Sequence, residues 1–129
     1  LIGLTGDRFV QVWRLQGERP PVYAGRFHTG AGAHSFRSLG DGRHVLVSNR
    51  AANTISKLDL VGWRIVDQYP APGGPDDMDL LKDGRTLLVT SRWARKLSVI
   101  DMVDRKVVAQ VRVGRSPHGV WTLDHLPRR

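Results

Sequence analysis

A stretch of 35 residues occurs twice in this chain, and this repetition restricts the fold more than any other feature. The stretch from Asp41 to Pro75 returns without a gap as the stretch from Asp83 to Pro117, so the period is 42 residues. Both copies begin with Asp-Gly-Arg and consist of short runs rich in Val, Ile, Leu and Thr, bounded by Gly, Pro, Asp or Asn. A period near 40 residues with strand-like content is typical of the blades of a β-propeller.

The predicted fold class is therefore all-β, with about three four-stranded antiparallel blades of a β-propeller. Counting the strands of a blade outward from the central channel, we expect a partial blade without its inner strand over residues 1–29, complete blades over 33–70 and 75–113, and a closing inner strand over Pro117 to Leu123. Within the partial blade, Gly17 and the pair Pro20-Pro21 predict a turn over residues 16–21.

Three units of 42 residues account for the 129 residues of the chain. Propellers close with about 4–8 blades, so we expect either a larger parent chain or a homo-oligomer whose copies complete the ring. No run reaches the roughly 18 apolar residues that a membrane helix needs, which predicts no membrane span.

The chain is strongly basic, with a formal net charge of +8 and no cysteine. The absence of cysteine excludes disulfides and cysteine-ligated zinc sites. The excess of positive charge favours a polyanionic partner, such as nucleic acid, anionic lipid head groups or an acidic protein. The alternative is a basic surface that only keeps the protein in solution.

In a propeller, the loops that join the fourth strand to the next first strand share one face with the loops that join second to third strands. This arrangement predicts a basic, ligand-binding loop face. Arginine can form paired hydrogen bonds with phosphate or carboxylate groups, and a tryptophan can stack on a nucleic acid base. The alternative is a solvated loop surface on which the tryptophan packs against a blade. The residues predicted to bind a ligand on this face are Arg50, Asn53, Arg92, Trp93, Arg95 and Arg115.

Two histidines occupy equivalent positions, since His34 and His118 lie two periods apart. Neutral imidazole is a common metal ligand, so this pair is a candidate for binding a metal ion or a haem iron at the mouth of the channel. The alternative is that each ring ties a loop to the next blade. The intervening position holds Asp76.

Asp76 and Asp77 should point to opposite faces of a strand, which argues against a paired acid and base. No catalytic motif is visible, and the pattern favours a protein that is not an enzyme.

The repeat resembles the YVTN-type β-propeller family. The resemblance rests on the second strands Leu46-Val47-Ser48-Asn49 and Leu88-Val89-Thr90-Ser91, on the Asp-Gly-Arg turns, on Ile100-Asp101, and on Val113-Gly114 with Pro117-His118. It covers about residues 27–125. The first copy departs from the family in lacking the Tyr and in having Ser48 for Thr, and the second blade has Asp76 in place of a His at the joint between blades.

The resemblance implies a bacterial or archaeal propeller that is periplasmic or secreted. Related propellers include a DNA-binding periplasmic protein and the haem-carrying domain of cytochrome-type nitrite reductases. The expected function is a non-catalytic binding platform whose basic loop face binds a polyanion such as nucleic acid, or a protein partner. The alternative is a haem- or metal-binding propeller domain of a periplasmic oxidoreductase.

Overall fold

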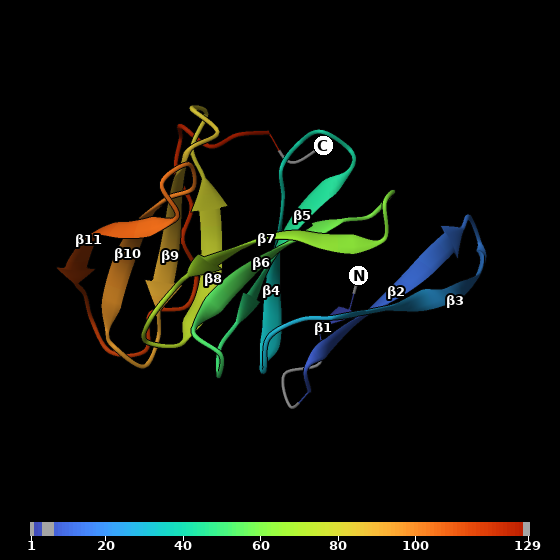
Figure 1. The fold of residues 1–129 in the computed structure, drawn as a ribbon, viewed down its shortest axis with the longest axis horizontal. Helices are drawn as coiled ribbons and strands as arrows, with labels where there is room; N and C mark the ends of the chain where they lie inside the picture. The colour runs from blue at the N-terminus through green and yellow to red at the C-terminus, as the bar shows by residue number, and fades with distance from the viewer. Residues whose placement is uncertain (1, 4–6, 128–129) are drawn as a thin grey trace.

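The computed structural model describes residues 2–3 and 7–127, and it confirms an all-β fold of antiparallel sheets. Three sheets lie side by side, with the hairpin of β2 and β3 extending away from the other two (Figure 1). The first sheet contains β1 (Ile2–Gly3), β2 (Phe9–Gln16) and β3 (Arg19–His28). The second contains β4 (Ala33–Ser38), β5 (His44–Asn49), β6 (Thr54–Asp59) and β7 (Arg64–Pro70). The third contains β8 (Pro75–Leu80), β9 (Thr86–Ser91), β10 (Lys96–Asp101) and β11 (Lys106–Arg112).

The second and third sheets repeat each other down to their irregularities. The pairing of β4 with β5 shifts register between Ala33 and Phe36, and the pairing of β8 with β9 shifts between Pro75 and Met78. Those two sites lie 42 residues apart. Because a bulge bends the strand and turns a side chain toward a new direction, a repeated bulge places equivalent side chains in equivalent directions.

Apolar side chains between the second and third sheets hold these two blades together. Leu46 and Ile55 of the second sheet belong to the same buried cluster as Met78, Leu80 and Leu87 of the third. Each of these side chains is at most 1% exposed. Burial of one such side chain contributes about 1.5–3 kcal/mol, so this packing is the main force that fixes one blade against the next.

The two inner strands, β4 and β8, are also joined by polar side chains. Ser35 Oγ donates a hydrogen bond to Asp77 Oδ1 at 2.8 Å. Arg37 Nε donates to Asp79 Oδ1 at 3.1 Å, and both of these side chains are fully buried. Since a buried ion pair requires good geometry, these contacts set the position of β8 beside β4 along its length.

The expected closing strand over Pro117 to Leu123 is wrong, because this segment forms no strand. It lies beside β8 in the place of a further inner strand, where the Thr122 amide donates to Asp79 Oδ2 at 3.0 Å. A first strand needs the second strand of its own blade as a partner, and the described residues after Leu123 supply only an isolated bridge between Leu81 and His125.

The expected turn over residues 16–21 is also too long. Strand β3 begins at Arg19 and includes Pro20 and Pro21. Strand β3 is the outer edge of its sheet, and Pro20 and Pro21 lie where its pairing with β2 shifts register and neither has a paired residue, so proline is tolerated there. Within the described residues, no helix is long and apolar enough to cross a membrane.

Candidate functional site

One end of the blades carries the loops that precede the inner strands and the loops between second and third strands. This loop face consists of residues 29–34, 50–53, 71–76, 92–95 and 113–118. The two kinds of loop are bonded to each other, since the Arg50 amide donates to the Gly32 carbonyl and the Arg92 amide donates to the Gly74 carbonyl, both at 2.9 Å. Gly32 and Gly74 have φ values of 80° and 72°, which other residues rarely adopt. Each arginine therefore leaves its strand at a fixed point on the loop face.

Three equivalent positions of the repeat meet on this face. His34 and Asp76 lie in the bulges at the start of β4 and β8, and His118 takes the next equivalent position. A hydroxyl from the neighbouring second strand holds the backbone at two of them. Ser48 Oγ donates to the Asp76 carbonyl at 2.8 Å, and Thr90 Oγ1 donates to the His118 carbonyl at 2.7 Å. The hydroxyl of the predicted repeat motif thus positions the residue of the following blade.

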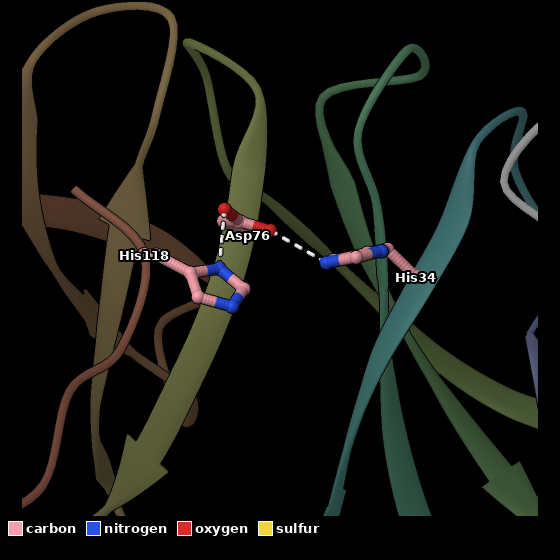
Figure 2. A group of neighbouring side chains, drawn as sticks. All are labelled: His34, Asp76 and His118. Carbon is pink, nitrogen blue, oxygen red and sulfur yellow. Dashed lines mark hydrogen bonds and ion pairs between the residues drawn. The ribbon is translucent and has the colours of Figure 1, made fainter. Parts of the chain in front are cut away.

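The Asp76 carboxylate lies between the two imidazole rings (Figure 2). His34 Nε2 is 2.7 Å from Asp76 Oδ1, and His118 Nδ1 is 2.8 Å from Asp76 Oδ2. Asp76 is fully buried, whereas the His118 side chain is 68% exposed. The buried carboxylate therefore orients both rings from the interior of the protein, and the outer edge of the His118 ring faces solvent.

Two arginines complete the group, which we call the Asp76 cluster: His34, Arg50, Asp76, Arg92 and His118. Arg50 Nε donates to Asp76 Oδ1 at 2.9 Å, and its Nη2 contacts the same oxygen and lies 2.6 Å from His34 Nε2. Arg92 Nη1 is 3.5 Å from Asp76 Oδ2 and its side chain is 40% exposed. One carboxylate thus faces four basic groups.

Burial and charge set the protonation of the inner part of the cluster. Partial burial, followed by the Arg50 charge, lowers the pKa of His34. Burial on its own would raise the pKa of Asp76, but the hydrogen bonds from Arg50 and His118 outweigh it, so this pKa lies below its ordinary value. At neutral pH, His34 is therefore neutral, while Asp76 is ionised. With both arginines charged, the cluster carries a net positive charge.

The predicted binding residues divide into two groups. His34, Arg50, Arg92 and His118 meet in the Asp76 cluster. The others remain in the loops. Asn53 braces a loop, because its Oδ1 accepts the amides of Gly73 and Gly74 at 3.0 and 2.9 Å. Trp93 is 60% exposed and lies against Gly74. Arg95 and Arg115 are exposed, and in the described part of the chain no ion pair or side-chain hydrogen bond links either of them to the cluster.

Sequence reasoning missed the residue at the centre. It points to His34 and His118 as candidate ligands, but it leaves out Asp76, which occupies the equivalent position between them. The period itself is the available signal, because equivalent positions of neighbouring blades converge on the channel. The prediction that the two histidines bind a metal ion or a haem iron stays a prediction; in this structure the Asp76 carboxylate contacts both rings.

Comparison with protein families gives a match over nearly the whole chain. A family model described as YNCE-like beta-propeller matches residues 1–128, which confirms the predicted propeller resemblance. No curated protein matches the chain.

Solved structures with the same fold include enzymes with different activities. The periplasmic gluconolactonase PpgL of Pseudomonas aeruginosa superposes with a TM-score of 0.74 at 23% identity, over 98% of this chain and 38% of that one. The dihydro-heme d1 dehydrogenase NirN, in complex with DHE, gives 0.64 at 24% identity, over 85% and 23%. Hydrazine synthase of Kuenenia stuttgartiensis gives 0.58 at 20% identity, over 64% and 23%. The chain thus spans well under half of each of these proteins, and identities this low show the fold alone.

Proposed function

The chain belongs to the YNCE-like beta-propeller family, and we propose that it is a non-catalytic binding module whose basic loop face binds a polyanion. Nucleic acid, as a single strand, is the class of polyanion that we infer. The observation that carries this proposal is the excess of cationic side chains around Asp76, because a fully buried carboxylate holds Arg50 and Arg92 together at the surface of one face.

The positions of the arginines support contact with phosphate groups. The contact of Arg92 Nη1 with Asp76 Oδ2 is long, at 3.5 Å, and the Arg92 side chain is 40% exposed. Part of the guanidinium group is therefore free to bind a ligand. Arg95 and Arg115 lie on the same face and are exposed. Arginine binds phosphate through paired hydrogen bonds, and a rigid scaffold lowers the entropy that such a contact costs.

Trp93 supports a single strand over a duplex. Its side chain is 60% exposed beside Arg92, and it covers the backbone of Gly74 with one side of the indole ring. An exposed indole flanked by arginines provides a stacking surface for an unpaired base, which a base inside a duplex cannot reach.

The test is the salt dependence of binding to a labelled oligothymidylate, followed by fluorescence anisotropy. Bound phosphate groups release counterions, so affinity should fall steeply with salt. The double replacement of Arg92 and Arg95 by Ala should reduce the slope of log K against log salt by about 0.7 for each phosphate group that the variant no longer binds. The matched control is Lys82→Ala, which removes one charge from an exposed side chain in the turn after β8, at the opposite end of the blade.

The proposal fails if the arginine variant and the Lys82 variant have the same slope and affinity as the parent chain. In that case the positive charge of the whole protein, and not the loop face, would attract the oligothymidylate. Strong oligothymidylate binding that does not depend on salt would also contradict the proposal, because the affinity would then come from stacking and not from phosphate contacts.

A periplasmic location is part of the same proposal. The gluconolactonase that shares the fold is described as periplasmic, and the absence of cysteine is compatible with that compartment. Fractionation of cells that express the full-length gene, with detection by an antibody, tests the location; recovery in the cytoplasmic fraction alone would exclude it.

A further inference from the structure

The three residues at equivalent positions of the repeat bring metal-binding atoms together. His34, Asp76 and His118 each offer one ligand atom, and these three atoms all lie within 4.8 Å of one another. Each residue comes from a different repeat unit, and two of the three sit in the bulges that start the inner strands. Figure 2 shows both rings directed at the carboxylate. His34 and Asp76 are held by strands β4 and β8, and the His118 carbonyl is held by the hydrogen bond from Thr90 Oγ1, which favours a defined geometry.

The donor atoms suit a divalent transition metal. Zinc and its neighbours bind imidazole nitrogen and carboxylate oxygen at about 2.0–2.2 Å, which puts neighbouring ligand atoms of a tetrahedral site about 3.3–3.5 Å apart. The histidine nitrogens now lie 2.7 and 2.8 Å from the oxygens of Asp76. Each of these nitrogen–oxygen distances would therefore have to lengthen by less than about 1 Å, and any pair of ligand atoms that lies farther apart, up to 4.8 Å, would have to come closer. Three protein ligands leave one coordination position for water or for an anionic ligand.

Arg50 already places a positive charge at this point. Its Nη2 contacts Asp76 Oδ1 and lies 2.6 Å from His34 Nε2, so the guanidinium group faces two of the three potential ligands. The side chain is 15% exposed and begins at the edge of the loop face, so solvent is within its reach. A buried carboxylate needs a positive partner, and either this guanidinium group or a metal ion can supply one.

We propose that His34, Asp76 and His118 form a binding site for a divalent transition-metal ion, and that Arg50 is the resident cation that moves aside when the ion binds. This site goes beyond the proposed binding of a polyanion. Arg50 then has opposite effects on the two ligands: its charge attracts a phosphate group and repels a metal ion.

The experiment is a titration of the full chain with Zn²⁺ by isothermal calorimetry, repeated with Co²⁺ while the visible absorption is recorded. We expect one ion per chain, and the Co²⁺ band reports the ligand set. His34→Ala and His118→Ala should each lower the affinity by at least about tenfold, as loss of a ligand or its support does. The matched control is His44→Ala, because His44 Nδ1, at the start of β5, also contacts a carboxylate, Asp41 Oδ2 at 2.6 Å, in the turn before that strand.

The direction in which Arg50→Met changes the metal affinity is the decisive result. Because the guanidinium group competes with the ion for these ligands, its removal should raise metal affinity by at least about tenfold, between the effects of a unit charge about 4 Å away in water and at a protein surface. The same variant should weaken oligothymidylate binding. Circular dichroism of each variant checks the fold, and His118→Ala is the safest variant because that side chain is 68% exposed.

The proposal is overturned if neither the parent chain nor Arg50→Met binds metal, or if His44→Ala loses as much affinity as His118→Ala. It is also overturned if Arg50→Met weakens metal binding. A chain that binds oligothymidylate but no metal refutes the metal site and leaves the proposed function intact, and a chain that binds metal but no oligothymidylate refutes only the proposed function.

Discussion

Replacement of Asp76 by Asn removes the charge that holds the cluster together while keeping the shape of the side chain. Asp76 is fully buried, Arg50 is 15% exposed and His118 is 68% exposed. Removal of one partner from a fully buried ion pair costs about 3–5 kcal/mol. Because Arg50 keeps some contact with solvent and can turn outward, we expect a smaller loss of about 2–3 kcal/mol in the free energy of unfolding. The exposed histidine adds little to this loss.

Urea unfolding followed by circular dichroism measures this loss. The control is Asp124→Asn, since Asp124 also pairs with a cation, Lys82 Nζ at 3.2 Å, but is 68% exposed. That change should stay within about 0.5 kcal/mol. In an Arg50→Met background, Asp76→Asn should cost at least about 1 kcal/mol less than in the parent chain, because the charge it balances is gone. Equal losses for Asp76→Asn and Asp124→Asn, or an unchanged cost without Arg50, would refute the assignment of Asp76 as the centre of the cluster.

Two further predictions concern the turns and the loop face. Hydrogen bonds from Arg85 lower the pKa of Asp101 to about 2. The pair therefore stabilises the fold at pH values above 3.8, the ordinary pKa of aspartate, and this stabilisation is lost as the pH falls toward 2. Asp101→Asn should flatten the acid side of a profile of the urea midpoint against pH, and an unchanged profile would contradict this. Gly74→Ala should cost more than Gly84→Ala and should alter tryptophan fluorescence. Both glycines have positive φ, which costs alanine about 1–2 kcal/mol, but only at Gly74 would a Cβ lie 2.4 Å from the Trp93 ring, so equal costs would contradict the contact.

The repeat is sufficient to predict the fold because the information in it is local. Short apolar runs and turn residues determine each strand, and a period of 42 residues with two full copies determines the blade. The prediction of a closing strand is wrong for a different reason. Whether Pro117 to Leu123 pairs as a strand depends on a partner strand and not on its own composition.

The candidate site is only partly predictable. The period indicates that His34 and His118 share a position, but the separation of two blades makes them look distant. Their convergence depends on two properties that the sequence does not display, namely the close packing of β4 against β8 and the bulges at residues 34 and 76. Sequence reasoning therefore places Asp76 at the position equivalent to His34 and His118, but it does not predict that the three side chains contact one another.

The most direct test of ligand binding on the loop face is a nuclear magnetic resonance titration with oligothymidylate, observing arginine Nε–H, histidine ring and indole N–H signals. We expect shifts for Arg50, Arg92, His118 and Trp93, all of which lie on the loop face, and unchanged signals for Arg43, which pairs with Asp59 at 2.6 Å at the opposite end of the blades. Shifts that centre on Arg43, or a full set of signals that does not move, would contradict the account.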